Sequence, residues 1–465
     1  MLFSSITFLY YFLPCVFLLY FITPARLKNA VLFLVSIVFY AWGEPRYALI
    51  MLASIALNYV FAILIEKVSG KTAKKILTGV SVGISLTFLL FFKYTDFFID
   101  NFNSATGLSV PLLGIALPIG ISFYTFQLVS YTVDVYRGIP AQKNPINLGA
   151  YITMFPQLIA GPIVRYSDIA VSLKNRRHTV DFAAQGITRF VIGLSKKILL
   201  ANTLGELCDI FRSCDDKSVL FYWIYAIAYA LHVYFDFSRY SDMAIGLGKI
   251  LGFDFCENFN YPYISTSVSE FWRRWHISLG SWFRDYVYIP MGGNRVNVPR
   301  RILNIFTVWF LTGLWHGAAW NFAIWGLYFA VLLTLEKNLF SKLLKRSKTL
   351  SRVYVIVAVL ISFVIFNAPD MSQAFSDIAS MFFAGGHPLV SSPTLYYLKS
   401  YAVLLIVGVI GATPVVKKAA VHFSENEKTK KLCSVLQPVI VAALLLVSTA
   451  YLADGSFNPF LYFRF

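Results

Sequence analysis

The sequence predicts an all-α integral membrane protein whose chain crosses the bilayer many times. Hydrophobic residues make up 58% of the 465 residues and charged residues only 14%, whereas a soluble domain carries about 25% charged residues. Apolar runs recur along the whole chain, and a helix needs about 20 mostly apolar residues to cross the hydrocarbon core. We therefore expect one membrane-embedded domain over residues 1–465, with about eleven to twelve spanning helices.

The charge balance is strongly basic, with 40 Lys+Arg against 23 Asp+Glu and a formal net charge of +17. In a soluble protein that excess would suggest a nucleic acid as partner. Here the cations lie in loops between apolar runs, and no separate basic domain could hold DNA or RNA. We therefore expect membrane lipid headgroups and a phosphorylated cofactor as anionic partners, and no nucleic acid.

The basic loops also predict the orientation in the membrane. The first four apolar runs are roughly residues 5–22, 28–43, 46–65 and 76–93. A lysine cluster between the third and fourth runs should be cytoplasmic, which places residues 94–110 and both termini outside. The same count places three further basic loops inside, at residues 165–178, 337–352 and 417–431. The net acidic loops 202–217 and 369–393 fall outside.

The ends of the chain and the cysteines add little chemistry. The N-terminus lacks the basic region of a cleaved signal peptide, so residues 5–22 are predicted to be a retained first span. The five cysteines show no metal-site spacing, and no metal is expected. Cys208 and Cys214 share one polar loop and could pair if that loop faces an oxidising compartment.

Three regions do not fit a plain span. Residues 146–165 are apolar but contain two glycines and two prolines, which predicts a re-entrant or broken segment. Residues 111–136 contain Pro118 and Gly120 and are expected to kink there. Residues 267–289, drawn as a helix, gather their aromatic side chains on one face and three arginines elsewhere. That pattern is typical of an amphipathic helix in the cytoplasmic membrane interface.

His316 lies inside the apolar stretch 302–335, which is long enough for two short spans. A charged side chain at the centre of a span costs about 2.5–3.5 kcal/mol on insertion scales. A neutral histidine escapes much of this cost and keeps a ring nitrogen that can accept a proton. The predicted topology places His316 at the turn between the two spans, away from the cytoplasm. It is either a general base or a neutral histidine bonded to a carbonyl or to Asn321.

His232 and Asp236 form a second group of ionisable residues in an apolar run. They are four residues apart, which places them on one helical face, and Asp242 follows near the inner end of that span. A carboxylate paired with an imidazole can orient a base, relay protons or only neutralise itself. The pattern favours a structural pair.

His276 lies on the aromatic face of residues 267–289, beside Arg273 and Arg274. An interfacial histidine usually anchors an amphipathic helix. Arginines beside tryptophans, with Arg284 nearby, would also bind the phosphates of a large anionic donor. No nucleotide-binding loop, HExxH or GxSxG motif is present, which removes most support for an ATP-driven pump or a serine hydrolase.

Six sequence blocks spread over nearly the whole chain carry a resemblance to a known family. They are GISFYTFQ (120–127), MFPQLIAGPIVRY (154–166), YFDFSRYSDMAIGLG (234–248), NFNYPYISTSVSEFWRRWHISLGSWFRDYVYIPMGGNR (258–295), TGLWHGAAWNF (312–322) and the final YFRF. They resemble the membrane-bound O-acyltransferase (MBOAT) family, most closely the branch containing the membrane subunit of bacterial alginate O-acetylation. One departure is Arg239, where relatives often carry glycine.

The resemblance implies an MBOAT-like helical bundle in a bacterial inner membrane, with His316 as the catalytic residue and His276 as a second functional histidine. Acetyl would come from cytoplasmic acetyl-CoA, a substrate rather than a bound cofactor. A partner acetyltransferase of the SGNH type would place it on a polysaccharide hydroxyl outside. Supporting roles are then expected for Asn321, Asp236 and His232, and donor binding for Arg273, Arg274 and Arg284.

Two other functions stay open at this point. A proton-coupled transporter or exporter could use His232, Asp236 and Asp242 as a relay, although no internal symmetry of two halves is visible in the sequence. A catalytically passive subunit could serve only to anchor a partner. The sequence does not distinguish alginate from another exopolysaccharide, cellulose or peptidoglycan as the final acceptor.

Overall fold

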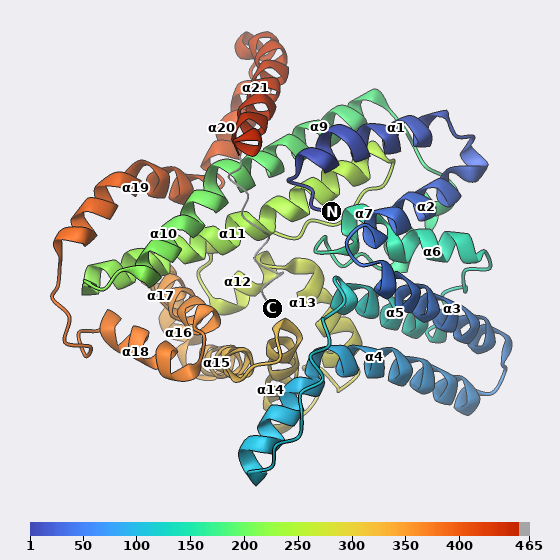
Figure 1. Ribbon diagram of the computed structural model, residues 1–465, viewed down its shortest axis with the longest axis horizontal. Coiled ribbons are helices and arrows are strands. Elements are labelled where there is room, and N and C mark those ends of the chain that lie inside the picture. Colours follow the sequence, from blue (N-terminus) through green and yellow to red (C-terminus); the bar gives the residue numbers. More distant parts are fainter. Residues whose placement is uncertain (455–465) are drawn as a thin grey trace. The chain divides into compact units, whose positions relative to one another are not determined.

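A computed structural model describes residues 1–454, and every regular element in that range is a helix (Figure 1). The chain packs into two compact units, of which the first comprises Met1–Phe190 and Met243–Cys256. The second comprises Val191–Asp242 and the chain from Glu257. Two long helices, α9 and α11, run from one unit into the other. A single domain over the whole chain therefore stays a prediction.

The first unit is built from the N-terminal helices. Here and below, η denotes a short 3₁₀ or π-helical segment. The elements are η1 (Thr7–Phe12), α1 (Leu13–Ile22), η2 (Ala25–Leu27), α2 (Lys28–Ala41), α3 (Pro45–Lys67), α4 (Lys71–Thr106), α5 (Ile121–Tyr136), α6 (Pro145–Thr153), α7 (Phe155–Leu158), α8 (Tyr166–Lys174) and the start of α9 (Val180–Ser195).

The second unit carries the remaining helices and all the histidines singled out above. Its elements are η3 (Lys196–Ala201), α10 (Asn202–Ser213), most of α11 (Val219–Ile250), η4 (Pro262–Ile264), α12 (Val268–Arg274), α13 (Ile277–Phe283), η5 (Arg284–Tyr288), α14 (Val298–His316), α15 (Trp320–Leu335), η6 (Glu336–Phe340), α16 (Ser341–Leu344), α17 (Lys348–Asn367), α18 (Met371–Met381), α19 (Ser392–Gly411), α20 (Val415–Glu425) and α21 (Glu427–Ala453).

Seven helices of the described chain are long and apolar enough to cross a membrane. They are Pro45–Lys67, Lys71–Thr106, Val219–Ile250, Trp320–Leu344, Lys348–Asn367, Ser392–Gly411 and Glu427–Ala453. The predicted class of an all-α, multi-pass membrane protein is confirmed. The total of eleven to twelve spans and the extracytoplasmic position of both termini stay predictions.

Helix α4 is longer than the sequence suggested. Residues 94–110 were expected to form an outside loop, but the helix continues to Thr106 and ends at Gly107, whose φ of 73° is left-handed. Residues 94–106 contain no glycine or proline, and Gly107 provides the usual C-terminal cap. The chain that follows Gly107 folds back on the helix, where the Asp96 carboxylate accepts hydrogen bonds from the backbone N–H groups of Leu113 and Gly114, at 2.8 and 3.0 Å.

The two irregular regions of the first unit differ in how well they were predicted. Residues 146–165 are broken and mostly buried, as expected, with the short helices α6 and α7 followed by a non-helical stretch. The kink expected in residues 111–136 is wrong. Helix α5 begins only at Ile121, because Gly120, at a φ of 75°, precedes it as the N-cap. A Cβ at Gly120 would lie 2.9 Å from the Leu158 carbonyl oxygen.

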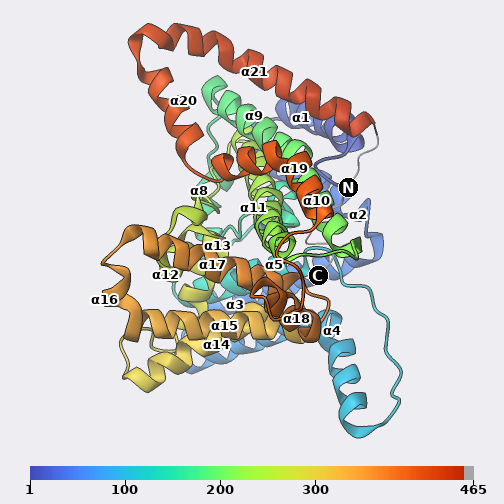
Figure 2. The same cartoon turned by 90° about the vertical axis from the view of Figure 1, so that its left-hand side faces the viewer.

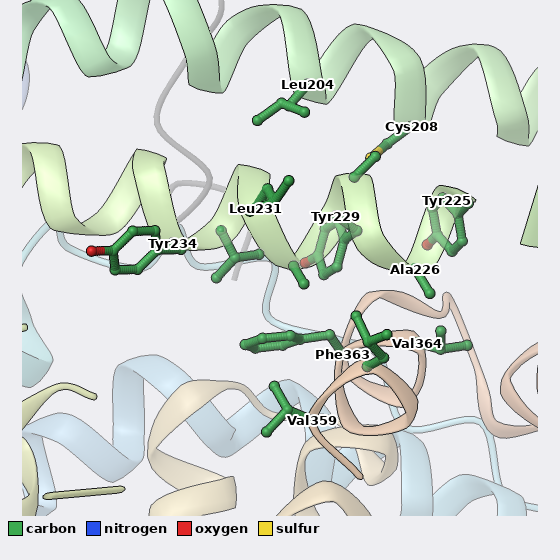
Figure 3. Packing of buried hydrophobic residues seen from close by; sticks show 14 of the residues in the cluster. Leu204, Cys208, Tyr225, Ala226, Tyr229, Leu231, Tyr234, Val359, Phe363 and Val364 are labelled. Carbon is green, nitrogen blue, oxygen red and sulfur yellow. The ribbon is translucent and has the colours of Figure 1, made fainter. Parts of the chain in front are cut away.

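The core of the second unit lies between α10, α11 and α17, as Figure 3 shows. Aromatic side chains of α11, among them Tyr225 and Tyr229, pack between Leu204 of α10 and Phe363 of α17. Burying one such side chain contributes about 1.5–3 kcal/mol in water. Inside a bilayer the lipid is itself apolar, so close packing and interhelical hydrogen bonds carry more of the association.

Candidate active site

Helices α14 and α15 form a tight hairpin (Figure 2). His316 is the last residue of α14, and α15 begins at Trp320. A Cβ on Gly326 would lie 2.2 Å from the Trp309 carbonyl oxygen, so only glycine permits this approach of the two backbones. His316 therefore lies at the turn of the hairpin, the position that the apolar stretch 302–335 suggested.

The His316 side chain is surrounded by aromatic rings and is only 7% exposed. Its ring centroid lies 5.0 Å from that of Trp325 and 5.3 Å from that of Phe366, both close to perpendicular. The adjacent Trp315 is 5.2 Å away. Edge-to-face contacts of this kind are directional. They hold the imidazole in one orientation.

The Trp315 ring also contacts His276, at a centroid distance of 6.0 Å. The two histidines come from different segments, yet both contact the same tryptophan. His276 is 2% exposed and packs edge-on against Phe237, with ring centroids 4.6 Å apart. The alternative of His276 as the anchor of an amphipathic interfacial helix is therefore wrong, because its side chain is buried within the protein.

The segment around His276 is not the single amphipathic helix expected over residues 267–289. Helix α12 ends at Arg274, and α13 starts at Ile277, with His276 between them at a φ of 45° and a ψ of 54°. The break is stabilised from outside the segment, because the Asn258 carbonyl oxygen accepts a hydrogen bond from the Ile277 N–H at 3.0 Å. A periodic pattern cannot reveal this distant contact.

The Asn258 side chain also determines which nitrogen of His276 carries the proton. Its Nδ2 donates to Ser241 Oγ at 3.0 Å, which turns Oδ1 towards His276 Nδ1, 3.2 Å away. Ser278 donates to the same Oδ1 through its N–H and its hydroxyl. Because Oδ1 only accepts, Nδ1 must donate, and the lone pair lies on Nε2.

The Nε2 atom of His276 is buried and has no hydrogen-bond partner within residues 1–454. Burial lowers the pKa of His276 to about 3, so the imidazole is neutral at physiological pH. A neutral ring with an unused lone pair can accept a proton or a hydrogen bond from a bound group.

A cavity of about 1190 Å³ adjoins this histidine. It exceeds the 300–1,000 Å³ typical of small-molecule pockets. Its lining includes His276, Trp272, Trp309 and five cations, which are Arg273, Arg284, Lys337, Lys345 and Lys348. Glu336 is the acidic residue in this lining. The cavity thus combines a basic wall with indole rings and a buried neutral histidine, a surface suited to a large anionic ligand with an apolar part.

The sequence model of the membrane-bound O-acyltransferase family matches residues 115–372, which include both histidines and the whole cavity lining. The chain is 38% identical to the probable alginate O-acetylase AlgI of Azotobacter vinelandii, with both chains covered completely. It is 34% identical to the peptidoglycan O-acetyltransferase of Helicobacter pylori, covering 72% of this chain and 70% of that one.

The chain belongs to the membrane-bound O-acyltransferase family. It is an acyltransferase of the alginate O-acetylation branch. A more distant relative is the teichoic acid D-alanyltransferase of Bacillus subtilis, 32% identical over 53% of this chain and 65% of that one. The names of these relatives therefore differ both in the acyl group and in the acceptor polymer.

In this MBOAT chain the predicted donor-binding arginines differ in position. Arg273 and Arg284 line the cavity, whereas Arg274 does not and pairs with Glu270, 2.8 Å away. Burial raises the pKa of Glu270, but hydrogen bonds from Thr266 and Arg274 outweigh it, so that the pKa lies below its usual value. Arg284 also forms an ion pair with Asp285.

Asn321 supports the hairpin through its neighbour α17. Its Nδ2 is 3.1 Å from the Ala368 carbonyl oxygen and 3.4 Å from that of Phe366. Phe366 is the residue whose ring packs against His316. Asn321 thus ties the end of α17 to the start of α15 and positions one wall of the His316 site.

His232 and Asp236 interact electrostatically, as expected of a structural pair, and each also has a partner that the sequence did not indicate. His232 Nδ1 lies 2.7 Å from the Ala201 carbonyl oxygen, while Asp236 forms ion pairs with Lys197 at 2.8 Å and Arg239 at 3.1 Å. Spacing along the sequence could not indicate the Lys197 ion pair, because Lys197 lies in η3 and Asp236 in α11. Arg239, the departure from the family pattern, is thereby explained as part of a buried ionic cluster.

Three residues of the site were not singled out from the sequence. Asn258 and Trp315 lie inside the matching blocks, and only their contacts reveal their roles. The Glu336 carboxylate accepts a 2.7 Å hydrogen bond from the Val268 N–H, which fixes the start of α12. The final YFRF motif lies outside the described residues.

The remaining chemistry is sparse. No group of histidine, cysteine and acidic residues that could hold a metal occurs in residues 1–454. No disulfide forms among the cysteines of residues 1–454, so Cys208 and Cys214 are not joined in this structure.

Proposed function

We propose that this chain takes an acetyl group from cytoplasmic acetyl-CoA and passes it across the membrane for O-acetylation of an extracytoplasmic polysaccharide. A partner acetyltransferase of the SGNH type completes the transfer outside. The names of the relatives support O-acetylation of an alginate-like exopolysaccharide or a cell-wall polymer as the pathway. The bacterial inner membrane is the location that this pathway requires.

The cavity beside His276 is the observation that carries the proposal. Acetyl-CoA has a phosphorylated nucleotide at one end and an acetylated thiol on a long flexible arm at the other. Arg273, Lys345 and Lys348 on the cavity wall would bind the phosphates. The arm would lie along Trp272 and Trp309 and bring the thioester to His276, which lines the cavity and contacts Trp315, the neighbour of His316. Both termini would then be extracytoplasmic, as the basic loops predict.

His316 acts in this proposal as the general base. It removes the proton from the acceptor hydroxyl as that oxygen forms a bond to the acetyl carbonyl carbon. The bond from that carbon to sulfur then breaks, and the CoA thiolate leaves and takes up the proton. His276, whose Nε2 lone pair is unused, would accept a hydrogen bond from an amide N–H of the donor's arm beside the thioester. Asn321, Asp236 and His232 would hold the surrounding helices in place.

The proposal is tested by measuring CoA release from the purified full-length protein. Acetyl-CoA is the donor in this assay, and the partner acetyltransferase is the acceptor. The variant His316→Ala should lose about 10²–10⁴-fold in rate, the usual contribution of a general base. His422→Ala is the matched control, because His422 is exposed on α20. A folded His316→Ala variant with the wild-type rate would overturn His316 as the general base and would favour a catalytically passive subunit.

Donor binding has its own test. Lys345→Gln should raise the KM for acetyl-CoA and leave kcat nearly unchanged, because the lost contact is present in ground and transition states alike. Arg346→Gln removes the same charge from the next residue, which does not line the cavity. Equal effects of the two substitutions would argue against acetyl-CoA in this cavity.

The transporter alternative loses its support. Asp236 is paired with Lys197 and Arg239, and Asp242 with Lys196 at 2.7 Å. Carboxylates held in ion pairs are poor members of a proton relay, because each protonation would break a pair. The family assignment independently places the chain among acyltransferases.

A further inference from the structure

Two cations and a histidine of the first unit converge on one buried tyrosine. Tyr20, near the end of α1, has no exposed surface. Its hydroxyl donates to the Leu251 carbonyl oxygen at 2.7 Å and lies 2.8 Å from Arg176 Nη1 and 3.0 Å from His178 Nε2. The Lys28 ammonium lies 4.4 Å from the centre of the tyrosine ring.

This cluster carries positive charge without a nearby negative one. The Tyr20 proton is used by Leu251, so its oxygen accepts from Arg176 and from His178. Within residues 1–454 none of Lys28, Arg176 and His178 forms an ion pair with a carboxylate. Burial, together with Lys28 and Arg176, lowers the pKa of His178. The cations repel one another, and a bound anion would remove that cost.

The Arg176 side chain is held in place by a ring contact and a hydrogen bond. Its guanidinium lies 4.7 Å from the centre of the Phe253 ring, and its hydrogen bond to Tyr20 uses one of five donors. The other four donors have no hydrogen-bond partner within residues 1–454. A guanidinium fixed in this way loses little entropy when it binds a phosphate through two parallel hydrogen bonds.

The surroundings of the cluster favour an amphiphile over a free anion. Leu18, Phe21 and Ile22 of α1 are 64, 48 and 73% exposed, and the Phe21 ring centre is 5.4 Å from the Lys28 ammonium. Helix α2 also begins at Lys28 without a side-chain cap, so its free N–H groups add partial positive charge. A headgroup at the cations would leave acyl chains beside these apolar side chains.

We propose that Lys28 and Arg176 bind the phosphate of an anionic phospholipid, whose acyl chains lie against the exposed apolar side chains of α1. Residues 23–27 and 165–178 both fall on the predicted cytoplasmic side, so the lipid belongs to the cytoplasmic leaflet. The site is separate from the acyl-transfer chemistry and does not depend on the proposed donor.

Native mass spectrometry of the full-length protein in detergent tests this site with short-chain phosphatidylglycerol, phosphatidylcholine and inorganic phosphate as probes. Wild-type protein should retain phosphatidylglycerol in preference to phosphatidylcholine. Arg176→Gln should weaken that retention about five-fold, the effect of removing one cation near a membrane surface. Arg177→Gln is the control, because it removes the same charge from the exposed neighbouring residue.

Three results would overturn the proposal. Equal weakening by Arg177→Gln would indicate general charge attraction rather than a site. Equal retention of the two lipids would remove the role of the headgroup charge. Protection from thermal unfolding by inorganic phosphate to the same degree as by phosphatidylglycerol would identify a free anion as the ligand. If Arg176→Gln does not fold, Lys28→Gln provides the same test. The Lys28 ammonium contacts only the faces of two aromatic rings, so its loss should disturb the fold less.

Discussion

Asn258 shows how one residue can define a site from a distance. Its side chain and carbonyl oxygen hold Ser241, His276, Ile277 and Ser278 together. It keeps His276 in a left-handed conformation that non-glycine residues avoid. It also places the ring proton on Nδ1. The sequence block around Asn258 was recognised through its resemblance to a family, but the role of the residue could not be derived from spacing.

Replacement of Asn258 should therefore impair catalysis more than binding. Asn258→Ala removes the acceptor for His276 Nδ1–H and allows the ring to turn. We expect kcat to fall on the order of 10²-fold, as for a misplaced catalytic group, with a smaller change in the KM for acetyl-CoA. Steady-state kinetics measure the split. Asn260→Ala changes an exposed position of the same loop and should behave as wild type. An equal fall in kcat for both variants would show that the effect comes from the loop and not from the Asn258 side chain.

The buried ionic cluster allows a second prediction at the scale of residues. Lys197 and Arg239 share the carboxylate of Asp236, and all three side chains are almost fully buried. Asp236→Asn removes the negative charge from two cations and should destabilise the protein by about 3–5 kcal/mol. Arg239→Gln leaves a balanced pair and should cost less. Thermal unfolding in detergent compares them; a larger loss for Arg239→Gln would contradict this charge balance.

At the scale of elements, the sequence predicted helices well where local pattern decides and poorly where distant contacts decide. The hairpin around His316 follows from an apolar stretch with a polar turn. Residues 267–289 have an equally regular pattern, yet the helix breaks at His276 because Asn258 supplies the hydrogen bonds there. Likewise, the unpredicted extension of α4 ends only where Gly107 can adopt a positive φ.

The α14–α15 hairpin depends on the absence of a side chain at Gly326. An alanine Cβ would meet the Trp309 carbonyl oxygen at 2.2 Å, so the helices would have to separate. Gly326→Ala should cost about 1–3 kcal/mol, as overpacking does, and should lower acetyl transfer because His316 would shift. Gly83→Ala on α4 is the control, since its Cβ would contact nothing within 4 Å. Equal unfolding temperatures for the two variants would contradict this account of the hairpin.

At the scale of the whole molecule, topology decides whether the donor and the acceptor can reach the histidines from opposite sides. Acyl transfer across a membrane needs a cytoplasmic entrance for the donor. The cations of the cavity wall include Lys337, Lys345 and Lys348, which belong to a loop predicted to be cytoplasmic. The loop 369–393 at the other end of α17 is acidic and predicted to be outside. The orientation of α17 therefore fixes the side from which the cavity opens.

Cysteine labelling in cells tests this orientation directly. Helix α17 has 20 residues, about 30 Å at 1.5 Å per residue, which matches the hydrocarbon core. In a background without the native cysteines, Ala384→Cys should react with a membrane-impermeant maleimide in intact spheroplasts. Arg346→Cys should react only after permeabilisation, because basic loops stay inside. Both positions are exposed on the protein, so burial does not hide either one. The opposite labelling pattern would show that the protein has the reverse orientation in the membrane. The basic cavity would then lie outside, where no acetyl-CoA could reach it.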